Sequence, residues 1–280
     1  MVRRCAVVGS PISHSLSPLL HQAAYAWLGL DWRYGRFDLQ PAALPGFVAG
    51  LDDSWRGLSC TMPLKRAVLA LGQPDAAVQA VGAANTLVFD GPPGQASSTL
   101  VRNTDVTGLA AALRAAGLAK AASARVVGAG ATAASALCAL RLLGVPTIHL
   151  AARDLAARSA LIERVESWPA ALAEQTRPCR TAVGGQSQPV TLTAEPLDRP
   201  WRPVQLTVST IPAPAAAALA DGLVRATDAV FDVLYDPWPT PLAAAARRAG
   251  RTVLTGLDLL AHQAAGQVEL MAGRPVPVAV

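Results

Sequence analysis

Lysine is rare in this sequence, and one of its two lysines is a candidate for proton transfer. Of the 24 Lys and Arg residues, only Lys65 and Lys120 are lysines. A protein can lower the pKa of a lysine amine into the range useful for proton transfer, whereas a guanidinium stays charged. Lys65, directly before Arg66, is therefore a candidate general acid or base. The alternative is a surface lysine retained by chance.

Polar residues also interrupt apolar surroundings where elements are expected to end, and functional sites are commonly built at such ends. The first group is HSLS over 14–17. The hydroxyls of Ser15 and Ser17 lie beside an expected helix N-terminus, where they could bind a substrate carboxylate. Equally, Ser17 could be the N-cap of that helix and Ser15 a turn residue.

Three further polar groups follow along the chain: TMPLK over 61–65, AANT over 83–86 and NTD over 103–105. Asn85 and Asn103 could hydrogen-bond substrate hydroxyls, or they could be ordinary turn residues. Asp105 could orient the Lys65 amine and tune it electrostatically, or it could cap the helix that follows it. The sequence leaves both interpretations open.

A glycine-rich turn in the middle of the chain has the context of a dinucleotide site. In RVVGAGATAASALCALRLLG, over 125–144, a short apolar strand runs into Gly128 and Gly130 and then into an Ala/Leu-rich helix, with Ala133 at the third small position. Glycines there permit a tight turn and the close approach of a pyrophosphate to the helix N-terminus. The alternative is a tight turn that binds nothing.

Apolar runs separated by turn signals predict alternating strands and helices. In the first hundred residues we expect strands at 5–9, 57–62 and 84–89 and helices at 17–28 and 64–72. Beyond them we expect strands at 125–127, 147–151, 204–210 and 226–235 and helices at about 104–118, 213–220, 240–250 and 256–273. This alternation is typical of an α/β protein with mainly parallel sheets.

Length and composition exclude several classes of protein. The chain has 280 residues, 52% of them hydrophobic, which is enough for a full core. No apolar run reaches the roughly 18 to 20 residues of a membrane-spanning helix. The apolar stretch after Arg4 is too short for a signal peptide, so we expect a cytoplasmic protein.

Charge and cysteine content point away from nucleic acid and metal. The net charge of +5 comes from basic residues that are mostly spread singly, which argues against a nucleic-acid surface. The cysteines have no CxxC pair and no histidine nearby at metal-ligand spacing, so we expect them to be reduced and structural. They are Cys5, Cys60, Cys138 and Cys179.

Seven sequence blocks carry a resemblance that covers essentially the whole chain. In order they are GSPISHSLSP, GLSCTMPLK, GAANTL, NTDVTG, VVGAGATAASA, YDPWPTPL and GLDLLAHQA. Their order and spacing resemble those of the shikimate dehydrogenase family. The resemblance implies an NADP-dependent oxidoreductase that reversibly reduces 3-dehydroshikimate to shikimate, on the pathway to aromatic amino acids.

The resemblance also implies an α/β fold of two domains with the site in the cleft between them. The N-terminal α/β substrate domain, with a mainly parallel sheet, is expected over 1–107 plus 256–280, and a Rossmann-type dinucleotide-binding domain over 108–255. The implied partners are a small-molecule substrate and NADP, with no nucleic acid and no membrane, in a monomer or a homodimer. No metal is required, because the cofactor carries the hydride.

Matched to the family's motifs, Lys65 corresponds to the catalytic lysine and Asp105 to the aspartate paired with it. Lys65 would supply the proton that the developing alkoxide needs, and Asp105 would position the ammonium. The implied substrate positions are Ser15 and Ser17 for the carboxylate, Thr61, Asn85 and Gln263 for the hydroxyls, and Tyr235 lining the site.

The resemblance likewise implies a set of cofactor positions. They are Gly128, Ala129, Gly130, Ala131 and Thr132 in the pyrophosphate turn, Ala152 and Arg153 in an Asn-Arg-Thr-like motif, Val233 where a methionine is common, and Gly256 beside the nicotinamide. Arg153 suits the 2′-phosphate of NADP, but Asp154 stands where the family commonly has threonine and adds a negative charge. NAD therefore stays open, with Arg158 as a further basic residue close in sequence.

Three alternatives remain at this point. The first is an NAD-preferring quinate/shikimate dehydrogenase, suggested by Asp154 and by apolar replacements at Val106 and 259–260. The second is a non-catalytic sensor that binds shikimate, although such a module has no need of an intact Lys65 and Asp105 pair. The third is a folate enzyme of similar architecture, disfavoured because paired serines suit a small carboxylated polyol better than a pteridine.

Overall fold

The computed structural model describes residues 2–168, 190–197 and 200–278 and divides into two compact units. Unit 1 is formed by Met1–Gly108 and Leu260–Val280, and unit 2 by Leu109–Leu259. Unit 1 therefore takes its residues from two separate stretches of the chain, whereas unit 2 is one continuous stretch.

A six-stranded sheet with the order β2-β1-β3-β5-β6-β4 forms the centre of unit 1. β1 pairs in parallel with β2 and β3, whereas β5 runs antiparallel to β3 and β6. The strands are β1 Arg3–Gly9, β2 Trp32–Asp38, β3 Trp55–Cys60, β4 Gln73–Pro74, β5 Thr86–Phe89 and β6 Thr99–Arg102. Consequently the carboxyl ends of β1, β3 and β6 and the amino end of β5 meet at one edge of the sheet.

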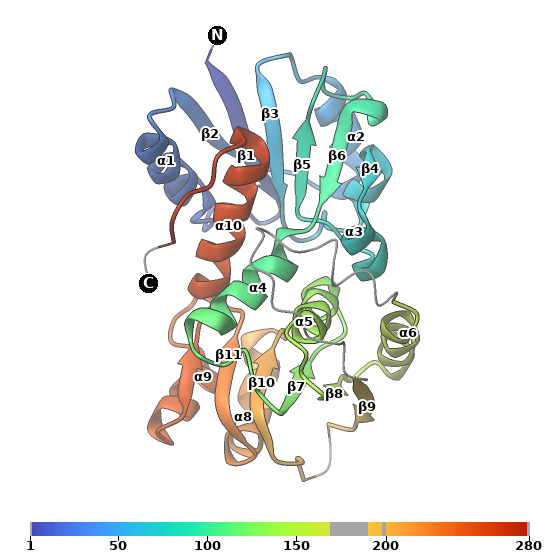
Figure 1. The fold of residues 1–280 in the computed structure, drawn as a ribbon, viewed down its shortest axis with the longest axis vertical. Helices are drawn as coiled ribbons and strands as arrows, with labels where there is room; N and C mark the ends of the chain where they lie inside the picture. Colours follow the sequence, from blue (N-terminus) through green and yellow to red (C-terminus); the bar gives the residue numbers. More distant parts are fainter. Residues whose placement is uncertain (1, 169–189, 198–199, 279–280) are drawn as a thin grey trace. The chain divides into compact units, whose positions relative to one another are not determined.

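Helices cover both faces of this sheet (Figure 1). They are α1 Ser17–Leu28 and α10 Gly256–Ala272 on one face, and α2 Leu44–Ala49, a 3₁₀ helix Ala67–Leu71 and α3 Ala76–Val81 on the other. Successive residues of β1 point to opposite faces. Val7 packs with Tyr25 and Met271 in one buried cluster, and Val8 packs with Leu44 in the other. The alternation thus gives unit 1 a core on each side of its sheet.

A parallel six-stranded sheet with the order β12-β11-β10-β7-β8-β9 forms the centre of unit 2. Its strands are β7 Ser123–Val127, β8 Thr147–Ala151, β9 Thr191–Glu195, β10 Val204–Ser209, β11 Thr227–Asp232 and β12 Thr252–Leu254. Its helices include α5 Ala131–Leu142, α6 Leu155–Glu166, α8 Ala213–Arg225 and α9 Pro241–Arg248, while α4 Thr104–Ala115 crosses the boundary between the units. The strand order reverses between β7 and β10, which is where open α/β sheets bind ligands.

The structure confirms the α/β class and most of the predicted elements, including the helix expected at 240–250, which is α9 and has Thr240 as its N-cap. The prediction that Ser17 is an N-cap was wrong. Leu16 occupies the cap position, and the Ser15 hydroxyl accepts a hydrogen bond from the Ser17 backbone N–H at 3.3 Å. A side chain one position before the cap has therefore taken over part of the capping role.

Two other differences come from weak local signals. The helix expected at 64–72 is the 3₁₀ helix Ala67–Leu71, since the segment is short and Gly72 lies with its backbone against that of Thr99. The elements that were not predicted include the strands β2, β4, β6, β9 and β12 and the short helices α2 and α3. β2 is an edge strand with mostly exposed side chains, so it lacks the apolar run of a buried strand.

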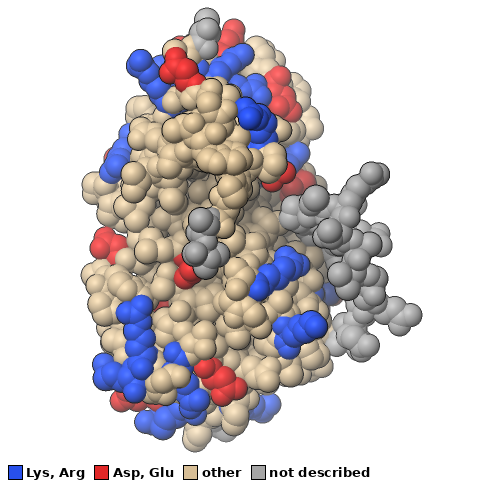
Figure 2. Space-filling model, turned by 60° about the vertical axis from the view of Figure 1, so that its left-hand side comes forward, with Lys and Arg blue, Asp and Glu red and all other residues tan. Residues whose placement is uncertain are grey.

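Charge is spread over the face of the molecule drawn in Figure 2, where Lys and Arg stand in small groups among Asp, Glu and other residues. Within the described ranges, no helix is both long and apolar enough to cross a membrane. Cys5, Cys60 and Cys138 are buried with free thiols, and Cys179 lies outside the described residues.

Candidate functional site

An ion pair between Lys65 and Asp105 lies at the edge of the unit 1 sheet where four strand ends meet. Lys65 follows the carboxyl end of β3, and Asp105 lies in the first turn of α4, directly after β6. The Lys65 Nζ atom donates to Asp105 Oδ2 at 2.6 Å. The exposed fractions of the Lys65 and Asp105 side chains are 18% and 6%, so the lysine is partly exposed while the aspartate is nearly covered. The structure therefore brings together the two residues for which the sequence predicted proton chemistry.

Asn103, rather than Asp105, caps α4. Its Oδ1 accepts hydrogen bonds from the backbone N–H groups of Asp105 at 3.0 Å and Val106 at 3.3 Å. Its Nδ2 donates to the Ala83 carbonyl at 2.9 Å. The sequence had left open whether Asp105 capped the helix or oriented Lys65. Because Asn103 supplies the cap, the Asp105 carboxylate is available to the lysine.

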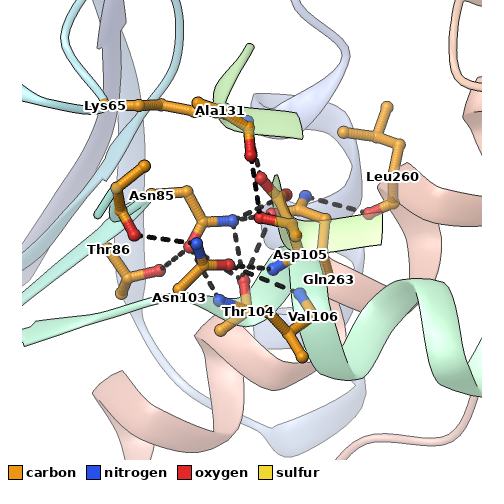
Figure 3. A network of polar contacts seen from close by, with 12 residues as sticks. Lys65, Asn85, Thr86, Asn103, Thr104, Asp105, Val106, Ala131, Leu260 and Gln263 are labelled. Carbon is orange, nitrogen blue, oxygen red and sulfur yellow. Dashed lines mark hydrogen bonds and ion pairs between the residues drawn. The ribbon is translucent and has the colours of Figure 1, made fainter. Parts of the chain in front are cut away.

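Asn85 connects this pair to α4 and α10 (Figure 3). Its Nδ2 donates to Asp105 Oδ1 at 2.9 Å, to Thr104 Oγ1 at 3.0 Å and to Gln263 Oε1 at 3.3 Å. Its Oδ1 accepts from the Thr104 backbone N–H at 2.8 Å and from the Thr86 hydroxyl at 2.8 Å. The carboxamide is thus held in one orientation, with its donor side toward Asp105.

Gln263 reaches the same group of side chains from α10. Its Nε2 donates to the Leu260 carbonyl at 3.0 Å, which turns its Oε1 toward Asn85 and Thr104. A residue near the end of the chain therefore lies beside one in its first third. The order of the strands and the packing of α10 produce this juxtaposition, which the sequence indicated only through the resemblance.

The predicted substrate residues Ser15, Ser17 and Thr61 follow β1 and β3, so they lie toward the same sheet edge. Ser15 and Ser17 are buried, and among the described residues no hydrogen bond is formed by the Ser17 hydroxyl. The Thr61 backbone N–H donates to the Val8 carbonyl at 2.9 Å, which fixes the turn that leads to Lys65.

Two glycines that the sequence analysis did not use shape this site. A Cβ at Gly9 would lie 2.4 Å from Thr61 Cγ2 and 2.7 Å from the Met62 carbonyl oxygen, so the turn after β3 can pack here only against glycine. A Cβ at Gly108 would lie 2.9 Å from the Cβ and the backbone nitrogen of Gln263. Gly108 is the last residue of the NTDVTG block, and its lack of a side chain lets α4 approach α10 closely.

A fully buried histidine lies in the interior of unit 1. His21 Nδ1 is 3.3 Å from Tyr25 Oη, its Nε2 is 3.2 Å from Gln267 Oε1, and its ring stacks on Tyr34 with centroids 4.0 Å apart. Desolvation by burial lowers the pKa of His21 to about 3, and the hydrogen bond with Gln267 acts in the opposite direction. His21 is therefore neutral at physiological pH.

This burial predicts a pH-dependent stability. Unfolded His21 binds a proton near its ordinary pKa of 6.5, whereas in the folded state it does so only near 3. The contribution of His21 to the free energy of unfolding is therefore fully present above pH 6.5. It is lost as the pH falls from 6.5 toward 3, by at most about 1.4 kcal/mol per pH unit. We expect His21→Phe to flatten the free energy of unfolding, measured by urea titration, across that range. The same substitution at exposed His14 should leave the slope unchanged, and equal slopes in all three proteins would contradict this prediction.

In unit 2, the turn after β7 has the geometry of a phosphate-binding glycine loop. Gly128 has a φ of 119°, and a Cβ there would lie 2.3 Å from Thr210 Oγ1. Gly130 is the N-cap of α5, and no described atom lies within 4 Å of a Cβ built on it. Ala133 is fully buried against the sheet. The first position thus makes the turn, the second leaves the helix N-terminus open, and the third packs the helix, which are the three roles of such a loop.

The neighbouring predicted cofactor residues lie after β8. Arg153 is exposed, and Ala152 is buried. The Asp154 carboxylate accepts a hydrogen bond from the Ala157 backbone N–H at 3.0 Å and so caps α6. The Arg158 Nη1 atom donates to the Glu195 carbonyl at 3.2 Å. Asp154 therefore has a structural role of its own, and Arg153 is the basic side chain here that extends to solvent.

The remaining predicted residues lie at the carboxyl ends of β11 and β12. The Val233 backbone N–H donates to the Ser209 carbonyl at 3.1 Å, and the Gly256 N–H donates to the Leu234 carbonyl at 3.1 Å. A Cβ at Gly256 would lie 2.3 Å from the Val233 carbonyl oxygen, so this crossing requires glycine. Tyr235 is half-buried in the segment after β11, in unit 2.

Comparisons with known proteins agree with this geometry. Residues 7–87 match the family model for the shikimate dehydrogenase substrate binding domain. A shikimate dehydrogenase (NADP(+)) of Synechococcus sp. is 32% identical over 98% of this chain and 91% of its own length. The structure of the Mycobacterium tuberculosis shikimate dehydrogenase matches with a TM-score of 0.83 and 38% identity, over 98% of this chain and 95% of that one. The Thermus thermophilus shikimate 5-dehydrogenase in complex with NADP(H) and shikimate matches with a TM-score of 0.77 and 29% identity, over 99% of this chain and 95% of that one.

Proposed function

The chain belongs to the shikimate dehydrogenase family, and from this premise we propose that it catalyses the reversible, NADP-dependent reduction of 3-dehydroshikimate to shikimate. The observation that carries the proposal is the 2.6 Å contact between Lys65 Nζ and Asp105 Oδ2, with the Asn85 amide donating to the other carboxylate oxygen. Reduction of a ketone needs a hydride on carbon and a proton on oxygen, and this group of side chains offers a proton donor held by a carboxylate.

Unit 1 is the proposed substrate-binding part and unit 2 the proposed dinucleotide-binding part. The open N-terminus of α5 at Gly130 fits a pyrophosphate, because helix dipole and free backbone N–H groups favour an anion there. Gly128 to Thr132 would hold that group, and Arg153 the 2′-phosphate. When bound, the cofactor supplies the hydride for the carbonyl carbon.

The chain's own contribution to the chemistry is the proton. As the carbonyl is reduced, negative charge develops on its oxygen, and the Lys65 ammonium donates a proton to that oxygen. In the reverse direction, the neutral amine accepts the proton from the shikimate hydroxyl. Asp105 keeps the Lys65 nitrogen in place in both directions, and its second oxygen accepts a hydrogen bond from Asn85.

Asn85 and Gln263 are proposed to hold substrate hydroxyls, and Ser15 and Ser17 the carboxylate. The Nδ2 atom of Asn85 has two N–H bonds but faces three acceptors. A substrate hydroxyl would replace the weakest of these contacts, which is the 3.3 Å contact to Gln263 Oε1. Substrate binding would thereby free the Gln263 carboxamide to form a hydrogen bond with a substrate hydroxyl.

The test is the initial rate of reduced-cofactor formation with purified protein, shikimate and NADP. We expect a saturable rate in both substrates. Folded protein that gives no rate with either shikimate or quinate and either NADP or NAD, yet binds shikimate by calorimetry, would support the non-catalytic sensor and overturn the proposal.

The exposed Arg153 side chain is expected to decide the preference for NADP over NAD. Arg153→Gln is expected to raise the KM for NADP by about tenfold, since one charge-assisted contact to the 2′-phosphate is lost, and to leave the KM for NAD within about twofold. Arg158→Gln is the comparison, because the Arg158 side chain bonds to the Glu195 carbonyl instead. Equal effects on NADP and NAD would favour the NAD-preferring quinate/shikimate dehydrogenase.

A further inference from the structure

A chain of buried polar side chains runs from Asn85 into the interior of unit 1. Its members are Thr86 on β5, Gln267 on α10, Ser59 on β3, and His21 on α1. All are at least nine-tenths buried, and none of them is proposed above to contact substrate or cofactor. A buried polar network whose members all have hydrogen-bond partners holds its side chains in one arrangement.

One contact fixes the orientation of the Gln267 carboxamide. The atom facing the Asn85 carbonyl oxygen, at 3.0 Å, must be the donor Nε2, because a carbonyl oxygen can only accept. The acceptor Oε1 then faces Ser59 Oγ at 2.7 Å and His21 Nε2 at 3.2 Å, so both of these groups must donate. His21 therefore carries its proton on Nε2, and its Nδ1 accepts from the Tyr25 hydroxyl at 3.3 Å.

The same reasoning fixes the hydroxyl proton of Thr86. Thr86 Oγ1 accepts from Gln267 Nε2 at 3.1 Å, so it donates its own proton to Asn85 Oδ1 at 2.8 Å. With Oδ1 held in this way, Asn85 presents Nδ2 to Asp105 Oδ1 at 2.9 Å. His21 thus donates to Gln267, Gln267 to Thr86, Thr86 to Asn85, and Asn85 to the Asp105 carboxylate. The four hydrogen bonds all run in the same direction along the series.

Hydrogen bonds aligned head to tail polarise one another and strengthen the last bond of the series. Here the last bond is the one from Asn85 to the carboxylate that holds Lys65. Burial keeps His21 neutral, so no second charge enters the chain from its far end. Gln267 also joins β3, β5 and α10, the elements that carry or adjoin Lys65, Asn85 and Gln263.

We propose that Gln267 and Thr86 are positioning residues of the reaction, which orient the Asn85 amide toward Asp105 and thereby hold the lysine and aspartate pair in its reactive geometry. This inference rests on the proposed function. It assigns these residues no contact with substrate or cofactor. Their effect on the reaction passes through Asn85.

A pair of variants at Thr86 and a single variant at Gln267 test the proposal. Thr86→Val keeps the shape of the side chain and removes the proton donated to Asn85, whereas Thr86→Ser retains it. Gln267→Met keeps the approximate length of the side chain without its donors and acceptors. We expect Thr86→Val and Gln267→Met to lower kcat/KM for shikimate by about tenfold, the effect of one lost hydrogen bond to an oriented group. Thr86→Ser should restore activity to within about twofold, and the KM for NADP should stay unchanged in all of them.

Val268→Ala provides the matched control for a purely structural role. Val268 is buried on the same helix as Gln267, in an apolar cluster with Tyr25 and Met271. It should lower the melting temperature while leaving kcat/KM within about twofold at a temperature where the protein is folded. If Thr86→Val retains the activity of Thr86→Ser, or if Val268→Ala loses as much activity as Thr86→Val, the positioning role is wrong. If Gln267→Met does not fold, the comparison of Thr86→Val with Thr86→Ser still tests the positioning role. A wild-type protein without turnover would overturn the proposed function, not the positioning role alone.

Discussion

Lys65→Met is expected to lower kcat for shikimate oxidation by about three orders of magnitude while shikimate binding changes by less than about threefold. Positioned general acid–base groups contribute about 10² to 10⁴ in rate, and in this site the Lys65 amine is the group placed to carry the proton. Methionine keeps the apolar stem and removes only the amine. The measurements are kcat from reduced-cofactor formation and the shikimate Kd from calorimetry.

Lys65→Arg separates charge from proton transfer. A guanidinium retains the ion pair with Asp105, but it cannot readily release a proton. We therefore expect Lys65→Arg to bind shikimate and to remain about as inactive as Lys65→Met. An arginine variant with a tenth or more of the wild-type kcat would show that positive charge alone suffices, and the proposed role of Lys65 would be wrong.

The second large effect is expected at the glycine turn of unit 2. There, alanine at one glycine should lower stability, and alanine at the other should weaken NADP binding. Gly128→Ala places a side chain on a backbone with φ of 119° and 2.3 Å from Thr210 Oγ1. The strain and the clash together are expected to lower the free energy of unfolding by about 2 kcal/mol or more. Thermal denaturation without any ligand measures this effect.

Gly130→Ala should lower the free energy of unfolding by no more than about 1 kcal/mol, since alanine is a poorer N-cap than glycine but the φ of −83° is ordinary and no described atom lies within 4 Å of the added Cβ. The added methyl group would occupy the space above the N-terminus of α5 that a pyrophosphate needs. We expect the Kd for NADP to rise by about tenfold or more, while the shikimate Kd stays the same. If the Gly130→Ala protein binds NADP with the wild-type Kd, the proposed pyrophosphate site at the N-terminus of α5 is wrong.

The sequence predicted the α/β class, which the structure confirms, and it predicted few of the side-chain contacts around Lys65. Lys65 could be singled out because the chain has only two lysines, and its pairing with Asp105 followed from the resemblance. Whether Asp105 capped α4 could not be decided, since Asn103 and Asp105 are both good capping residues and the choice depends on the Ala83 carbonyl 20 residues away. Ser17 was assigned as an N-cap from its type, although Ser15 carries the capping contact.

Buried polar residues were the part that the sequence could least predict. Arg125 lies in β7, where an arginine in a short strand is expected at the surface. In the structure it is fully buried, and its Nε donates at 2.6 Å to Glu195, a residue 70 positions later on β9. Gln267 similarly appears as a polar residue on an amphipathic helix. Only the packing of β3, β5 and α10 around it shows that each of its polar atoms has a partner.

The division of unit 1 between the two ends of the sequence has a consequence for synthesis on the ribosome. Met1–Gly108 emerges first, but its sheet lacks the helix that supplies Gln263 and Gln267 until Leu260–Ala272 has been made. Unit 2, a continuous segment, can complete its own sheet before that helix appears. Nascent unit 1 therefore has to wait, with one face of its sheet covered by α1 but not by α10, while the whole of unit 2 is translated. A chaperone that recognises exposed apolar strands would have its main opportunity during that interval.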